Sequence, residues 1–275
     1  MIRLGLVLLL SLACAHAGTE SPGPGLTLET ETRTAPRPMH LHWLTADLNT
    51  AGLALVFSPV DSESTSPAKV LAAKPTERLL TLGWKALLNG DAFYVIGDEK
   101  KRYPAVGDPL ALQGYAVFDG KRYGQRSPNN GTFYVLNDRK TMGVTYDAPP
   151  KNTWGAVGGY RIVLRDGKIG SHIDNTRLHP RSVIGFNNAT RQVYFLVVDG
   201  RQPGRSEGAT EQELGEWMLA RGATDALSLD GGGSAILVIE QDGGARVVNR
   251  PVGVWDQPGT VRCIGNAVGL QFKVE

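Results

Sequence analysis

A chain of 275 residues is long enough for one sizeable hydrophobic core, or at most two small ones. Hydrophobic residues make up 41% of it and charged residues 20%, which describes an ordinary globular protein. The formal net charge is +2 with no basic block or stripe, so no nucleic-acid partner is expected. The 34 glycines and 16 prolines favour many turns and short strands over a helical bundle.

The first 17 residues have the pattern of a secretory signal peptide. Arg3 supplies the positive start, and the apolar run 4–12 is too short to span a bilayer. Ala15-His16-Ala17 fits the small-x-small cleavage pattern. We therefore expect an exported protein, periplasmic or extracellular, whose mature chain begins at Gly18 and contains no transmembrane helix.

The two cysteines bear on anchoring and on disulfides. Lipid attachment at Cys14 is the alternative to simple export, although Ser11 stands where a lipoprotein signal normally has Leu. If Cys14 leaves with the signal, Cys263 is alone and no intrachain disulfide can form. We expect Cys263 to be a small buried residue near the last strand.

The N-terminal part of the mature chain predicts a linker. Residues 18–38 are rich in Thr, Pro, Gly and Glu and show no apolar periodicity, so we expect a disordered segment. The folded domain is expected to span residues 39–275. Its first strands are predicted at residues 40–44 and 53–57, where apolar residues dominate.

The middle of the chain carries signals for a short helix, a strand and a hairpin. Pro75 opens a predicted short helix through Leu82, and residues 85–88, apolar after Lys85, predict a strand that runs into Asn89-Gly90. Residues 121–155 are expected to be loop-rich. Residues 161–169 predict a hairpin around Asp166-Gly167.

The last third of the chain carries the clearest elements. Residues 192–198 are apolar on both faces and predict a central strand. Thr210 and Glu213 form a capping box for a helix that ends at Gly222, and a further strand follows at 225–229. The expected fold is α+β, with one large mixed, mostly antiparallel sheet flanked by two or three helices.

The stretch after that strand is the strongest functional signal. Asp230 is followed by three glycines and Ser234, and an apolar run follows. Such a loop can aim several N–H groups at one point and form an anion-binding nest, which suits a phosphorylated ligand. A flexible hairpin turn is the alternative. A nucleophile elbow is excluded because position 236 is Ile, and a P-loop because no Lys follows the glycines.

Other polar residues stand just past apolar runs, where active sites commonly form. Asn89, Asp91 and Asp199 do so together with Asp230. Arg181 precedes an apolar run and is the preferred cation, whereas Arg201 and Arg205 flank a turn and are read as solvated. His40 and His42 share a strand face without a third ligand, so no metal site is predicted.

The order of these motifs resembles that of the phosphodiester glycosidase family over roughly residues 80–272. The motifs that carry the resemblance are Asn89-Gly90-x-x-Phe93, His179-Pro-Arg-Ser-Val-Ile-Gly185, Val198-Asp-Gly-Arg201, Ser206 to Leu214, Ser228-Leu-Asp-Gly-Gly-Gly-Ser234, Val248-Asn249-Arg-Pro251 and Arg262. The chain departs from the family pattern at Asp91, Ala92, Ser182, Ser228 and Ala235. These changes bear on sugar specificity more than on the type of reaction.

The resemblance implies cleavage of the C1–O bond of a sugar-1-phosphodiester, in a cell-envelope or secreted glycan, without cofactor or metal. A carboxylate near C1 would support the oxocarbenium-like transition state, and an arginine or the nest would bind the phosphate. Asp230, Asp199 and Arg181 are the expected catalytic residues, and the nest is expected to lower the pKa of Asp230. The expected substrate-binding residues are Asn89, Gly200, Ser206, Gly231, Gly232, Gly233, Ser234 and Asn249. A non-catalytic glycan- or phosphosugar-binding module on the same scaffold is the alternative.

Overall fold

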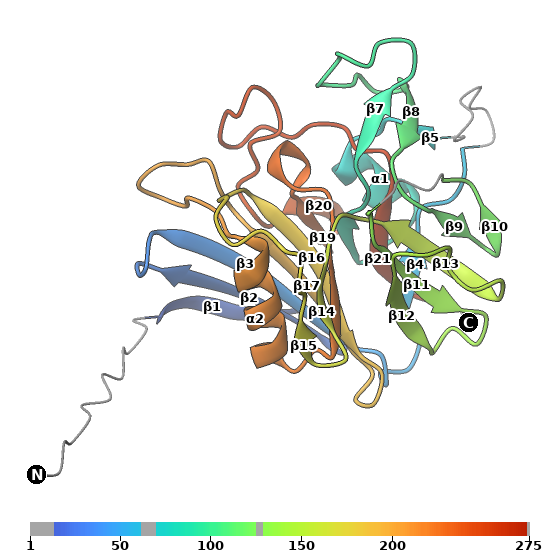
Figure 1. Cartoon of the computed structure of the whole chain (residues 1–275), viewed down its shortest axis with the longest axis horizontal. Coiled ribbons are helices and arrows are strands. Elements are labelled where there is room, and N and C mark those ends of the chain that lie inside the picture. Colours follow the sequence, from blue (N-terminus) through green and yellow to red (C-terminus); the bar gives the residue numbers. More distant parts are fainter. Residues whose placement is uncertain (1–13, 62–69, 125–128, 274–275) are drawn as a thin grey trace, which may run out of the picture.

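The computed structural model describes residues 14–61, 70–124 and 129–273. Within them the strands form four sheets of eight, five, five and three strands, and neighbouring strands pair antiparallel (Figure 1). The expectation of one large sheet is therefore wrong. The chain is richer in strands than predicted, and its strands are divided between several sheets.

The largest sheet positions the glycine loop. In spatial order its strands are β1 (Cys14–Gly23), β2 (Leu26–Arg33), β3 (Met39–Asp47), β17 (Gln192–Val198), β16 (Arg181–Asn187), β18 (Asp225–Ser228), β14 (Ile162–Arg165) and β15 (Lys168–Ile169). As predicted, β17 is central and is buried on both faces. The predicted hairpin is confirmed as β14 and β15, with Asp166 and Gly167 both at positive φ in the turn.

The other three sheets come from the chain between β3 and the C-terminus. One contains β20 (Gly244–Val247), β19 (Leu237–Gln241), β6 (Ala86–Asn89), β21 (Ala267–Phe272) and β4 (Leu53–Phe57). The second contains β10 (Lys121–Arg122), β9 (Val117–Phe118), β13 (Thr153–Gly158), β11 (Thr132–Leu136) and β12 (Met142–Thr145). The small sheet contains β5 (Val70–Leu71), β8 (Pro109–Leu112) and β7 (Phe93–Val95).

The main core lies where the eight-stranded sheet meets the two five-stranded sheets. Phe186 and Phe195 of the large sheet belong to the same buried cluster as Phe57 of β4 and Phe133 of β11. The rings of Phe133 and Phe186 stand 5.5 Å apart at their centroids, a distance typical of packed aromatic pairs. The sheets are thus held together by shared apolar burial.

The two helices of the described residues follow the sequence signals. α1 spans Pro75–Thr81 with Pro at its start. α2 spans Glu211–Arg221, has the predicted capping box at Thr210 and ends at Gly222 in the left-handed conformation. The apolar face of α2 packs on the large sheet through Leu214 and Met218 (Figure 1). No helix in the described ranges is long and apolar enough to cross a membrane.

The expected linker at residues 18–38 is instead part of the sheet. Within this segment, β1 and β2 pair with one another, and β2 pairs along its whole length with β3. Leu26 and Leu28 alternate into the core, and Glu29 on the other side forms an ion pair with Arg221 of α2. Two buried leucines are a weak sequence signal for a strand. The backbone hydrogen bonds that stabilise β2 come from pairing with its neighbours in the sheet, β1 and β3.

Residues 121–155 also hold more structure than expected, because β10, β11, β12 and the start of β13 lie there. Their apolar residues, such as Phe133, are separated by polar and turn residues, which conceals the alternation in the sequence. The predicted signal peptide, residues 1–17, lies mostly outside the described residues.

Candidate functional site

Asp230 lies where two sheets approach one another. The residue follows β18 of the large sheet, and the chain then passes through the glycine loop into β19 of a five-stranded sheet. The backbone N–H of Asp230 donates to the carbonyl of Gly90 at 3.0 Å, just past the end of β6. Asp230 is therefore held from both sheets, and its side chain is only 11% exposed.

Asn89 holds Asp230 in this position. Its Nδ2 donates to the Asp230 carbonyl at 2.7 Å, while its Oδ1 accepts from the Ser182 hydroxyl at 2.6 Å and the Ile236 N–H at 3.1 Å. The buried amide is thus occupied by internal partners. The structure places Asn89 behind Asp230 as a positioning residue, whereas the sequence suggested substrate contact.

Arg262 is the cationic partner of Asp230. One guanidinium nitrogen lies 3.2 Å from Asp230 Oδ2, and Nε donates to the Ser234 hydroxyl at 2.9 Å. Burial raises the pKa of Asp230, while Arg262, Ser234 and the Gly231 N–H act in the opposite direction. The expected net lowering of this pKa is wrong, because desolvation outweighs the groups that favour the carboxylate.

The glycine loop does not form the expected nest of converging N–H groups. Gly232 to Ser234 make a short 3₁₀ turn, in which the Ser234 N–H donates to the Gly231 carbonyl at 3.1 Å. The Gly232 N–H donates to the Pro180 carbonyl at 2.9 Å. Gly232 has a φ of 57°, and an added Cβ would lie 3.1 Å from the Arg201 guanidinium. Gly232 therefore allows the close approach of Arg201, whereas Gly231 and Gly233 lie against backbone carbonyls.

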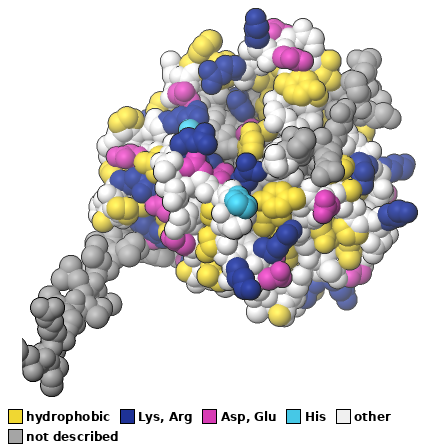
Figure 2. Space-filling model, in the orientation of Figure 1, with side chains coloured by type: hydrophobic (Ala, Val, Ile, Leu, Met, Phe, Trp, Pro, Cys, Tyr) yellow, Lys and Arg dark blue, Asp and Glu magenta, His cyan; other side chains and the backbone are white. Residues whose placement is uncertain are grey.

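A cavity of about 760 Å³ opens in front of Asp230 and the three glycines. Its walls carry three acidic residues, Asp174, Glu211 and Asp230. They carry twice as many arginines, namely Arg102, Arg161, Arg177, Arg181, Arg201 and Arg262. The face seen in Figure 2 shows basic side chains gathered around a hollow near its centre. This excess of positive charge favours an anionic ligand such as a phosphate diester.

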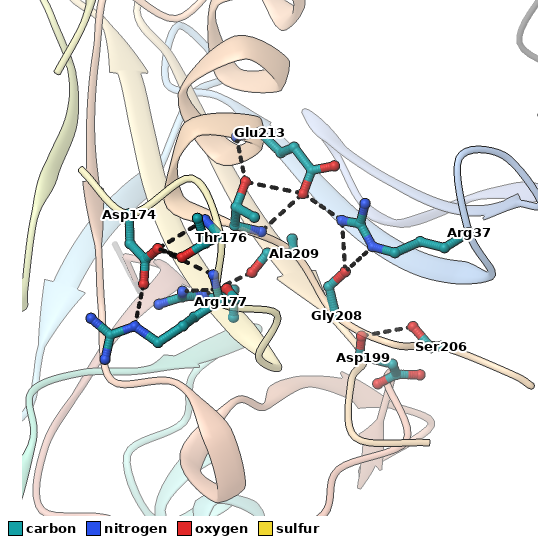
Figure 3. A network of polar contacts seen from close by, with 11 residues as sticks. Arg37, Asp174, Thr176, Arg177, Asp199, Ser206, Gly208, Ala209 and Glu213 are labelled. Carbon is teal, nitrogen blue, oxygen red and sulfur yellow. Dashed lines mark hydrogen bonds and ion pairs between the residues drawn. The ribbon is translucent and has the colours of Figure 1, made fainter. Parts of the chain in front are cut away.

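Arg181 lies in the cavity wall beside the start of α2. Its Nε donates to the Ala209 carbonyl at 3.0 Å, and another guanidinium nitrogen lies 3.6 Å from Glu211. The loop opposite is fixed by Asp174, which binds Arg177 and Thr176 (Figure 3). Arg181 thus lines the cavity, and its orientation is set by backbone and side-chain acceptors.

The N-terminus of α2 is locked by a second set of contacts. Glu213, the capping-box residue, also accepts from Arg37, which donates in addition to the Gly208 carbonyl (Figure 3). The first two N–H groups of the helix have no partner within it and donate to the Asp174 carbonyl instead. The Glu211 nitrogen lies 2.9 Å from that oxygen, and the Gln212 nitrogen 3.3 Å. The helix start therefore shapes the cavity wall.

Asp199 belongs to a separate buried network. Its Oδ1 accepts from Asn249 at 3.2 Å and from the Arg250 N–H at 2.9 Å, and its backbone carbonyl accepts from the Ser206 hydroxyl at 2.7 Å. Its other carboxylate oxygen lies 3.4 Å from His42. Figure 3 shows Asp199 and Ser206 apart from Asp174 and Arg177. None of Asp199, Ser206 and Asn249 lines the cavity.

Gly200 is required by the packing behind Arg181. An added Cβ at this position would lie 2.5 Å from the Pro180 nitrogen. Only glycine permits the end of β17 to pass so close to the residue before Arg181. Gly200 thus contributes to the shape of the site from behind the cavity.

The charge of Asp230 affects two further ionisable groups, and of these the sequence reasoning missed Tyr160. Tyr160 lines the cavity, and burial together with the neighbouring Asp230 and Asp91 raises its pKa. Asp91 is buried, accepts the Gly114 N–H on Oδ2, and donates its own N–H to Asn266 at 2.8 Å. Burial raises the pKa of Asp91 well above its usual value, and the charge of Asp230 adds to the shift.

The buried carboxyl of Asp91 gives a prediction about stability. Its pKa is higher in the folded than in the unfolded chain, so the wild type loses stability as the pH rises through the folded value. Asn at this position cannot ionise and can still accept the Gly114 N–H. We expect Asp91→Asn to unfold at a higher temperature than the wild type at pH 7. This advantage should shrink towards pH 4 in thermal unfolding curves, and a difference independent of pH would contradict the assignment.

The missed arginines carried little local signal. Arg262 stood at the end of the motif series, and Arg201 was interpreted as solvated, yet it lies in the cavity wall and pairs with Asp256 at 2.7 Å. Arg102 and Arg177 come from loops without a motif. The Gly158-Gly159 pair ahead of Tyr160 was the one visible hint of close packing at this point.

Among the described residues, no group of three or more His, Cys, Asp or Glu side chains is arranged to hold a metal ion. Cys263 is buried, as predicted.

Comparisons with solved structures place this architecture among known folds. The N-acetylglucosamine-1-phosphodiester alpha-N-acetylglucosaminidase catalytic domain from zebrafish is similar with a TM-score of 0.60 and 15% identity, covering 94% of this chain and 88% of that one. A candidate exported protein from Burkholderia pseudomallei has a TM-score of 0.59 and 13% identity, covering 86% and 75%. A hypothetical protein from Synechocystis has a TM-score of 0.58 and 13% identity, covering 90% of this chain but 62% of that one.

The sequence comparisons give the family. A search of curated protein sequences found no significant match. The sequence profile of the phosphodiester glycosidases, however, matches residues 83–271, which is more than half of the chain and includes Asn89, Asp230 and Arg262. The arginine-lined cavity, the similar folds and this match agree, and the chain belongs to the phosphodiester glycosidase family.

Proposed function

We propose that this protein hydrolyses the glycosidic C1–O bond of a sugar-1-phosphodiester in a cell-envelope or secreted glycan. The observation that carries the proposal is a buried carboxyl group, Asp230, in the wall of an arginine-rich cavity. A sugar-1-phosphodiester fits this pair of features, because its phosphate can bind the arginines and the positive charge that develops at C1 can be stabilised by Asp230. The family of the chain and the reaction in the name of the zebrafish protein support the same reading.

In this reaction the arginines and the Asp230 carboxyl group act on opposite sides of the bond that breaks. As the C1–O bond breaks, the electron pair leaves with the phosphate monoester, and positive charge develops on the sugar ring. Donors for the phosphate oxygens are supplied by Arg262, Arg201 and Arg181. Because the phosphate is a weak base, the leaving group has little need of a proton from a general acid. Water adds to C1 and loses a proton, which completes hydrolysis.

Asp230 is assigned to the sugar side. Its ionised form stabilises the positive charge near C1, either as nucleophile or as base for water. Arg262 favours that ionised form by direct contact, against the effect of burial. The two residues therefore act as a unit, with Arg262 facing both the carboxylate and the cavity.

A panel of synthetic substrates tests the proposal. We suggest the methyl phosphodiesters of α-linked N-acetylglucosamine, glucose, galactose and mannose, with release of free sugar as the readout. Turnover of at least one member supports the proposal. Binding without turnover across the panel would favour a phosphosugar-binding module, and neither binding nor turnover would exclude both functions for these sugars.

We further propose that the protein is exported, on the basis of the signal pattern in residues 1–17. Cleavage after Ala17 would remove the start of β1, which begins at Cys14. The intact mass of the protein recovered outside the cytoplasm should correspond to a chain beginning at Gly18. A diacylglyceryl group on Cys14 would instead demonstrate a membrane anchor.

A further inference from the structure

A second cavity adjoins the candidate active site. It has a volume of about 820 Å³ and lies along the β14–β15 hairpin and the chain after β12. Arg161 and His172 line both this cavity and the one that contains Asp230. The two hollows therefore share a wall, and a ligand longer than one sugar can occupy both.

Tyr146 presents an aromatic surface at the second cavity. The residue is 37% exposed, although its hydroxyl accepts the Ile162 N–H at 3.0 Å. The Arg165 guanidinium lies 5.9 Å from the ring centroid and is itself bound to the Val144 carbonyl at 2.9 Å. The ring is thus held in place while part of it stays accessible. A rigid tyrosine loses little conformational entropy on binding and offers an apolar surface with a polar end.

The charges of the second cavity differ from those of the first. It is lined by Arg161, Arg165 and Lys168 together with Asp147 and Asp166, so cations and carboxylates are nearly balanced. The first cavity, by contrast, contains six arginines and three acidic residues. The second cavity therefore fits a neutral, hydroxyl-rich group better than another phosphate. Arg161 is the arginine that lines both cavities.

We propose that the second cavity is a binding subsite for further sugar residues, so that the substrate is an oligomeric or polymeric glycan with phosphodiester links. The proposal rests on the proposed function for the identity of the bond that is cleaved. The reacting phosphodiester occupies the arginine-lined cavity, and the adjoining sugar stacks on Tyr146. Short substrates fill the first cavity alone.

Binding and turnover of a length series test the proposal. The probes are sugar-1-phosphodiester oligomers of one to six repeats, prepared from N-acetylglucosamine, glucose, galactose and mannose. For at least one sugar, we expect the wild-type Kd to fall about tenfold between one and three repeats, as an additional aromatic contact allows. Tyr146→Ala should abolish this gain and leave the Kd of the single repeat unchanged.

Control variants separate this subsite from a general loss of structure. Tyr94 on β7 is 40% exposed and lines neither cavity, so Tyr94→Ala should keep the length dependence. Lys168→Ala, an exposed change in the same cavity, serves as a second variant if Tyr146→Ala unfolds.

The outcomes distinguish the two proposals. If neither Kd nor kcat/KM depends on length for any sugar, or if the length dependence survives both variants, the subsite is excluded, even when single repeats are hydrolysed. If longer oligomers bind more tightly through Tyr146 but none is hydrolysed, the subsite stands and the proposed hydrolysis is excluded.

Discussion

Replacing Asp230 by Asn is expected to reduce turnover by a factor on the order of one hundred or more, as loss of a central electrostatic group typically does. The variant removes the negative charge near C1 and keeps the size of the side chain. Folding should be preserved, because the backbone of Asp230 is held by Gly90 and Asn89 independently of its carboxylate. Ligand binding should persist, since the arginines of the cavity remain. Single-turnover kinetics and the Kd of the same substrate separate the two effects.

Asp225→Asn is the matched control for this experiment. Asp225 begins the same strand, β18, at the end away from the cavity, so its substitution should leave turnover unchanged. Wild-type turnover in a well-folded Asp230→Asn protein would remove Asp230 from the mechanism. Asp199, the next carboxylate in the motif series, would then be substituted by Asn in the same way.

Replacing Arg262 by Gln is expected to affect both stability and activity. The change keeps much of the side chain but removes the charge beside Asp230. An uncompensated buried charge costs about 3–5 kcal/mol, unless the carboxylate takes up a proton. The pKa of Asp230 should therefore rise further, so that the acid limb of the pH–activity profile moves to higher pH. The loss of stability should be largest at neutral and alkaline pH, because ionisation of Asp230 then opposes folding.

A double-mutant cycle checks this mechanism. Arg262→Gln combined with Asp230→Asn should be more stable at pH 7 than Arg262→Gln alone, because no buried charge remains. Arg246→Gln is the control for removal of an arginine, since Arg246 pairs with Glu20 at 2.6 Å on another part of the surface. An unchanged acid limb in Arg262→Gln would show that Arg262 does not control the ionisation of Asp230.

The sequence by itself determined the elements whose causes are local. The capping box of Thr210 and Glu213, the turn at Asp166-Gly167 and the buried strand 192–198 were predicted and are confirmed. Each depends on residues within a few positions of one another, through a cap, a turn conformation or a run of apolar side chains. The motif order also predicted the family, which the sequence profile confirms.

The N-terminal strands show where local signals end. Residues 26–33 have two buried leucines among threonines and glutamates, which alone do not specify a strand. They form β2 because β3 offers a complete row of hydrogen-bonding groups along the whole length of the segment. A strand is stable only with its partner, and that partner is selected by tertiary packing.

Asp199 and Asp230 illustrate the same division within the site. Asp199 follows the buried strand β17, and Asp230 follows the buried strand β18. Both strands run antiparallel to β16, which lies between them, so their C-terminal ends point the same way and the two residues lie at the same end of the strands. In the sequence, each of them also follows an apolar run, so the sequence alone did not distinguish their roles. The loop at Asn249-Arg250 encloses the carboxylate of Asp199, whereas Arg262 and the glycine loop place that of Asp230 at the cavity.

The cavity itself was decided by tertiary structure alone. Its arginines are spread between positions 102 and 262; Arg181 begins β16, and the others lie between strands. A single arginine in a loop is usually solvated, and only its neighbours in space make it part of an anion site. The pKa of Asp230 was misjudged for the same reason, because desolvation depends on atoms packed from distant parts of the chain.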